Sequence, residues 1–109
     1  MSFRDHQERL DLYRQRDELI EQQPSAQREI DIARTGLRIE FIEGVMQKEV
    51  ADMTRLLFDS YLRAGSMSIV LRDDQRIGGL PHKTGNEIHD IRNVRAEAAR
   101  LAEIWYMRP

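Results

Sequence analysis

The sequence predicts a mainly α-helical fold: a helical hairpin or bundle with one short β-hairpin, at about residues 67–80, before a C-terminal helix. Three observations lead to this prediction. Apolar residues recur at three- and four-residue steps over much of the chain, few Gly and Pro residues interrupt them, and one β-branched stretch stands between long helical segments. A length of 109 residues fits one domain over residues 1–109.

Composition excludes several classes of function. The 17 basic and 19 acidic residues give a net charge of -2, which argues against wholesale electrostatic binding to nucleic acid or an anionic membrane. Cysteine is absent, which excludes disulfides, zinc-thiolate sites and a thiol nucleophile. No apolar run approaches the ~18 residues of a bilayer span, and the N-terminus lacks the apolar stretch of a signal peptide. We therefore expect a cytoplasmic protein without a membrane partner.

A first helix is expected over about residues 2–22. Ser2 is placed as its N-cap, and Leu10, Tyr13 and Ile20 fall near one face. This apolar stripe is narrow and surrounded by charged residues at three- and four-residue spacing, as on a solvated helix that meets one partner. Pro24 then interrupts the helix because proline lacks the backbone donor.

The main body is expected as helix over about residues 25–64, with Gly65 as its C-terminal cap. Residues 37–43 lie between two glycines and partly alternate, so a strand is the alternative there; helix is favoured because the helical apolar stripe continues through them. The stripe steps by three and four residues, as in a coiled coil. It consists of Ile39, Ile42, Met46, Val50, Met53, Leu57 and Tyr61.

The β-hairpin prediction rests on a β-branched stretch that is followed by two turn-forming residues, Asp73 and Asp74, and a return strand that ends at Leu80. Asn86 then caps a final helix over about residues 86–107. Alanines beside its apolar stripe allow another helix to approach closely. The stripe consists of Ile91, Val94, Ala98, Leu101 and Trp105.

Two apolar stripes in so short a chain are difficult to cover internally, because a two-stranded hairpin offers little area. We therefore expect a homo-oligomer, or docking on another protein, through the residues of both stripes. Trp105 supports an interface, since a tryptophan near a chain end is a typical anchor residue. The alternative is a monomeric bundle in which each stripe covers the other.

No catalytic residue, cofactor, metal site or small-molecule substrate is predicted, and we do not expect an enzyme. Residues 78–84 partly follow a phosphate-binding loop, but His82 replaces the required glycine and Pro81 removes an amide. His82, Glu87, His89 and Asp90 lack the spacing of a zinc site. An anion at the helix N-terminus is the alternative to an ordinary capped start. It would use Lys83, Gly85 and Asn86.

Nucleic-acid binding through a local basic surface is the main rival hypothesis. Arginines of the last helix and the hairpin would contact phosphates, although acidic residues share both elements. The sequence has no helix-turn-helix spacing and no aromatic stacking platform. The arginines in question are Arg72, Arg76, Arg92, Arg95 and Arg100.

The expected order of helix, hairpin and helix from Val45 to Trp105 resembles, in architecture, small phage head-to-tail connector proteins over about half of the chain. The resemblance implies a structural component of a phage or mobile element, which would place the protein in the virion. From the residues and the resemblance together, we expect a non-enzymatic, self-associating assembly or adaptor protein. The alternative is a small regulatory protein that binds nucleic acid, or that inhibits a host protein through a helical face.

Overall fold

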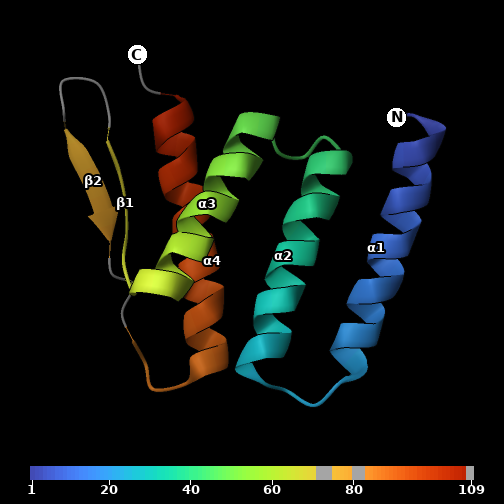
Figure 1. The fold of residues 1–109 in the computed structure, drawn as a ribbon, viewed down its shortest axis with the longest axis horizontal. Coiled ribbons are helices and arrows are strands. Elements are labelled where there is room, and N and C mark those ends of the chain that lie inside the picture. Colours follow the sequence, from blue (N-terminus) through green and yellow to red (C-terminus); the bar gives the residue numbers. More distant parts are fainter. Residues whose placement is uncertain (71–74, 80–82, 108–109) are drawn as a thin grey trace.

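The computed structural model describes residues 1–70, 75–79 and 83–107, and within them four helices and one two-stranded sheet form a flat molecule (Figure 1). Its backbone extends over 42 × 38 × 17 Å, with α1 and α2 side by side and α3 lying across α4. The predicted fold class is confirmed, because one hairpin precedes the last helix. The elements are α1 (Phe3–Glu21), α2 (Ala26–Ile42), α3 (Lys48–Ala64), β1 (Met67–Val70), β2 (Arg76–Gly79) and α4 (Glu87–Tyr106).

Three helices begin at a side-chain cap. Ser2, Ser25 and Asn86 each accept a hydrogen bond from the amide three residues further on, at 3.1, 3.0 and 3.1 Å. Such caps satisfy one of the amides that the first turn of a helix leaves without a partner. The predicted starts of the first and last helices are thus confirmed.

The main body is divided into two helices, so the single helical segment over residues 25–64 was wrong. A turn over residues 43–47 reverses the chain between α2 and α3. Gly44 has a φ of 74°, which glycine adopts without the steric cost that a side chain would add. Its amide and the amide of Val45 bond back to carbonyls of α2 at 3.1 and 2.9 Å. Residues 37–42 are helical, so the strand alternative for this region was wrong as well.

The hydrophobic core lies where α3, α4 and β1 meet. Leu57, Phe58, Val94, Ala98 and Leu101 form one cluster in which each residue is at most 3% exposed. Burial of apolar area is the main favourable term in folding, so this cluster is a principal source of stability. Its members come from both predicted stripes, which therefore face each other inside one chain.

The hairpin adds one covered face to the core. Met67 and Ile69 of β1 are 3% and 5% exposed, while the residues between and after them face outward. Ser68 pairs with Gly78 of β2, where a Cβ would lie 2.6 Å from the Met67 carbonyl oxygen, so glycine is required for this close approach. Five residues of the predicted hairpin lie outside the described residues: Leu71, Arg72, Asp73, Asp74 and Leu80.

Helix α1 stands at the edge of the molecule and packs against α2 (Figure 1). None of its residues is buried. Leu12 and Leu19 are half-buried, whereas Leu10 and Ile20 are 48% and 54% exposed, so the face that the sequence placed against a partner points partly outward. Neither α1 nor any other helix in the described part of the chain has the length and apolar character that crossing a bilayer requires.

Candidate protein-interaction surface

The structure separates the predicted interface residues into two sets. The first set is at most 4% exposed and packs inside the chain, so it offers no surface to another molecule. The prediction of an interface along both whole stripes therefore needs correction, because α3 and α4 cover each other. The buried set is Ile39, Val50, Leu57, Val94, Ala98 and Leu101. The half-buried set is Ile42, Met46, Met53, Tyr61, Ile91 and Trp105.

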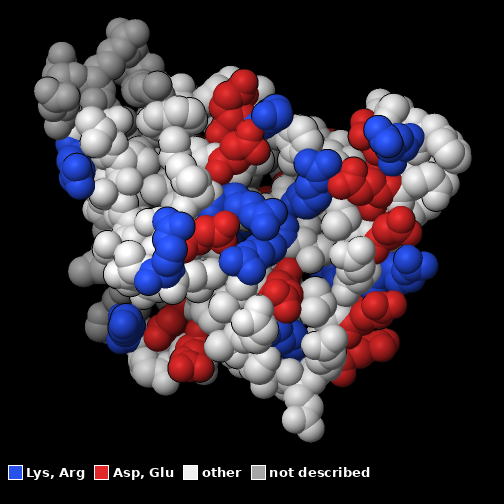
Figure 2. Space-filling view, in the orientation of Figure 1, with Lys and Arg blue, Asp and Glu red and all other residues white. Residues whose placement is uncertain are grey.

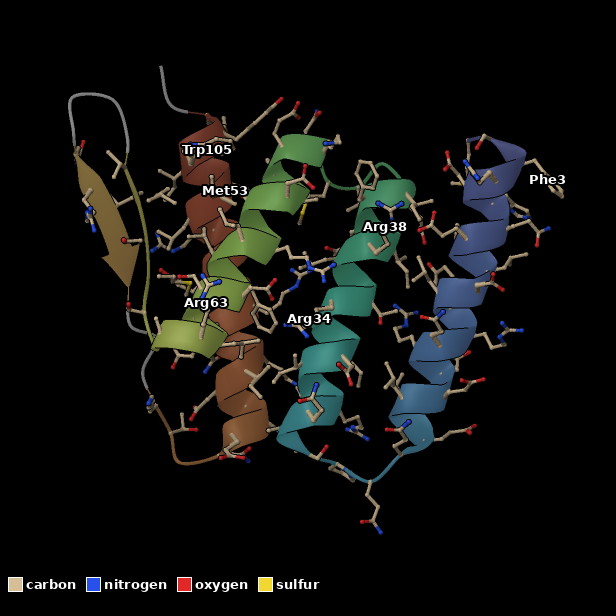
Figure 3. The ribbon with its side chains drawn as sticks, in the orientation of Figure 1. Phe3, Arg34, Arg38, Met53, Arg63 and Trp105 are labelled. Atoms are coloured by element: carbon tan, nitrogen blue, oxygen red, sulfur yellow. The ribbon has the colours of Figure 1, made fainter. Side chains whose placement is uncertain are left out.

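Two of the half-buried residues, Met53 and Trp105, line a groove between α3, β1 and the end of α4. The groove has a volume of about 400 Å³, and we call it the α3–β1 groove. Figure 3 shows Met53 and Arg63 on α3 and Trp105 near the end of α4. Its lining consists of Met53, Leu56, Leu57, Ser60, Arg63, Ser68, Ile69, Val70 and Trp105.

Local periodicity explains how the α3–β1 groove is built. Successive residues of a helix point about 100° apart, so Leu57 enters the core while Leu56 stays 60% exposed. Successive residues of a strand point to opposite faces, so Ile69 is buried while Val70 is 49% exposed. Core residues thus form the floor, and exposed apolar neighbours form the rim.

The charge at the α3–β1 groove comes from Arg63. This residue lies in the last turn of α3, where the helix dipole favours a cation, and it is exposed. Among the described residues it makes no ion pair. In Figure 2, the described part of the hairpin side is white with a few basic side chains among the white. The groove therefore combines apolar side chains with two serine hydroxyls and one positive charge, which forms no ion pair among the described residues.

A second exposed surface lies at the opposite edge, on the outer face of α1. Phe3, Leu10 and Asp17 are spaced by seven residues and so share one helix face, to which Glu21 also belongs. Phe3 is 79% exposed, and Figure 3 shows it projecting away from the other helices. Asp17 and Glu21 are exposed and make no ion pair within the described chain. We call these four residues the α1 outer stripe.

The inner face of α1 is held to α2 by polar contacts. The Arg38 guanidinium donates to both carboxylate oxygens of Glu8 at 2.7 and 3.2 Å, which lowers the pKa of Glu8. The Tyr13 hydroxyl donates to Glu43, and this bond, with a smaller effect of Arg9 at 3.5 Å, lowers the pKa of Glu43. These groups are solvent-accessible, so the docking of α1 depends on charge and is sensitive to pH and salt.

Among the described residues, the predicted nucleic-acid contacts do not form one unpaired basic surface. Three of the five arginines bond to carboxylates of the same chain, which neutralises their charge in place; the Arg92 contact to Glu29 measures 2.5 Å. Arg76 is exposed on β2, and Arg72 lies outside the described residues. The pairs are Arg92 with Glu29, Arg95 with Glu40 and Arg100 with Glu97.

The predicted anion site is filled by the chain's own groups. The Asp90 carboxylate accepts hydrogen bonds from the amide and the hydroxyl of Thr84 at 2.9 and 2.8 Å, and the amide bond is the main reason that the pKa of Asp90 is lowered. Asn86 caps α4, Gly85 has a φ of 88°, and Lys83 is exposed. His82 lies outside the described residues, within which no three His, Asp or Glu side chains come together as metal ligands.

Sequence reasoning missed one buried charge, Glu29. This residue of α2 is 5% exposed and lines a hollow of about 280 Å³ between α2 and α4, together with Ile91 and Arg92. One of its carboxylate oxygens accepts from Arg92, and the other has no hydrogen bond. No local pattern could have indicated this pair, because its residues are 63 positions apart.

Comparison of the chain with protein-family models, with curated proteins and with solved structures finds no match. The α3–β1 groove and the α1 outer stripe are therefore the features from which a function is inferred.

Proposed function

We propose that this chain is a non-enzymatic assembly protein that self-associates, and that the α3–β1 groove is its binding surface. The observation that carries the proposal is the exposure of Leu56, at 60%, beside half-buried Met53 and Trp105. A single exposed leucine is common on protein surfaces. A leucine, a methionine and a tryptophan that share one hollow are typical of docking surfaces, where a few large residues supply most of the binding energy.

The chemistry of the groove supports binding over catalysis. Its lining includes the hydroxyls of Ser60 and Ser68 but no histidine or carboxylate that would activate them. Arg63 is the charged group in that lining. A partner that fits these features presents an apolar helical face flanked by a carboxylate, because such a face fills the groove and pairs with Arg63.

The test is the absolute mass of the protein by light scattering over a concentration series. We expect the wild-type chain to form a discrete oligomer as concentration rises, and Leu56→Asp to shift this transition to at least tenfold higher concentration, because a carboxylate in the groove must be desolvated. Val45→Asp is the matched control, since Val45 is 73% exposed and lies outside the groove. A wild-type chain that stays monomeric throughout, or an equal effect of both variants, would refute the proposal.

A further inference from the structure

We infer that the occupant of the α3–β1 groove is the α1 outer stripe of a second copy of this chain. The inference rests on the proposed function, because it names the partner of the proposed binding surface. It joins two surfaces of complementary character. The groove has exposed Leu56 and the cation of Arg63, and the stripe has exposed Phe3 and the carboxylates of Asp17 and Glu21; none of these three charged groups makes an ion pair within the described residues.

The apolar parts of the two surfaces match. Phe3 and Leu10 of the stripe are 79% and 48% exposed, although both are large apolar residues. The groove offers the half-buried Trp105 and the exposed Leu56 to receive them. Contact between the two surfaces removes all four side chains from water at once, which is the main source of binding energy for such a helix-in-groove complex.

The charges match in position as well as in sign. Leu10 and Asp17 are seven residues apart on α1, and Leu56 and Arg63 are seven residues apart on α3. At 1.5 Å per residue, both pairs span about 10 Å along their helices. A helix α1 that lies parallel to α3 of the next copy therefore brings Leu10 to Leu56 and Asp17 to Arg63 in the same register.

The directions of the elements agree with this register. In Figure 1, α1 and α3 descend in the same sense along the chain, while α4 ascends and ends near the start of α3. In the parallel arrangement, Phe3 at the start of α1 therefore lies toward the Trp105 end of the groove (Figure 3). The aromatic residue meets the aromatic end, and the acidic part of α1 meets the Arg63 end.

The contact uses two different surfaces of each copy, so it is heterologous. Helix α1 and the hairpin stand at opposite ends of the longest dimension of the molecule, 42 Å (Figure 1). An open assembly of copies joined in this way therefore has an unoccupied groove at one end and an unoccupied stripe at the other, whatever the number of copies. Such a contact continues as an open chain or closes as a ring, whereas a two-fold contact stops at the dimer.

The test is a charge-reversal experiment on the wild-type background. Arg63→Glu and Asp17→Arg should each weaken self-association about tenfold by light scattering, because each replaces an attraction by a repulsion. An equimolar mixture of the two variants should recover assembly, since the groove of each variant accepts the stripe of the other. Lys83→Glu is the matched control: it changes the net charge by the same amount as Arg63→Glu, outside the groove, and should leave assembly unchanged.

The outcomes separate this inference from the proposed function. If the wild-type chain oligomerises and Arg63→Glu disrupts it while Asp17→Arg does not, the groove binds something other than α1 and the inference is overturned, but self-association stands. The same conclusion follows if both variants disrupt assembly and their mixture stays dissociated. A wild-type chain that never oligomerises overturns both proposals.

A cross-link provides a readout that does not depend on charge. The chain contains no cysteine, so Leu10→Cys and Leu56→Cys each carry a single thiol at an exposed position. After the two variants are mixed and mildly oxidised, a disulfide between them should form at least tenfold faster than a disulfide within either variant alone. Equal rates for all three pairs would overturn the inference.

Discussion

Replacing two neighbouring leucines of α3 by alanine, one at a time, separates the core face of this helix from its groove face. Leu57 is 3% exposed and packs in the core, whereas Leu56 is 60% exposed on the groove rim. Deletion of a buried leucine side chain costs the transfer energy of the lost groups plus a cavity term, about 3 kcal/mol in total. Deletion of the exposed one should change the free energy of unfolding by less than about 0.5 kcal/mol.

Urea unfolding at a concentration where the protein is monomeric, followed by circular dichroism, measures both changes. Because a domain of this size unfolds with about 5–15 kcal/mol, Leu57→Ala should lower the transition midpoint clearly while leaving the slope unchanged. Light scattering of the folded proteins should rank the variants the other way, with Leu56→Ala weakening self-association. If Leu56→Ala destabilised the monomer as much as Leu57→Ala, the assignment of the two faces of α3 would be refuted.

Three further predictions concern the hairpin, the helix caps and α1. The pKa values of Glu8 and Glu43 lie below their ordinary 4.5, so the stability that these carboxylates contribute is present above pH 4.5 and is lost as the pH falls through the lowered values. As the pH falls through this range, the amide chemical shifts of α1 should change before those of α4. Simultaneous changes in both helices would contradict this order. Gly78→Ala should destabilise the fold by about 1–3 kcal/mol in thermal unfolding, because its Cβ would meet a backbone oxygen of Met67 at 2.6 Å; an unchanged melting temperature would show that the strands can separate freely. Asn86→Ala should cost about 1 kcal/mol through the lost cap, and Asn86→Asp, which keeps an acceptor, should restore it.

The elements were largely predictable because their signals are local. Ser2 and Asn86 carry the hydrogen-bonding groups of a cap, and the apolar steps of α3 and α4 repeat within a few residues of each other. The break before α3 was missed although Gly44 stood in the sequence, because the apolar stripe continues across it without a change of period. A periodic pattern that continues unchanged through a turn does not indicate the turn. In the structure, the positive φ of Gly44 and the hydrogen bonds that follow it define the turn.

The candidate site was only partly predictable because its position depends on whether each apolar stripe packs against the other stripe of the same chain or against another molecule. The stripes that contain Leu57 and Leu101 have the pattern that a coiled-coil interface would have, and sequence alone does not say whether the partner stripe is in the same chain. The structure places them together in one core, so the candidate surface lies at their edges, where Met53 and Trp105 line the groove. Leu56 lies beside the periodic set, so the stripe alone did not include it among the predicted interface residues.

The solvent-exposed packing of α1 against α2 connects the order of this helix with the proposed assembly. A helix of 19 residues without a buried side chain is marginal in water, and the exposed ion pairs through which α2 holds it contribute little each. Docking of its outer stripe in a second copy would add apolar burial to the partial burial that Leu12 and Leu19 have in the monomer. Hydrogen exchange of α1 amides should therefore slow as protein concentration rises through the assembly transition, while the amides around Leu101 in α4 keep their rates. Protection of α1 that is independent of concentration would mean that α2 alone supports this helix, and that its outer stripe stays in water when the chains associate.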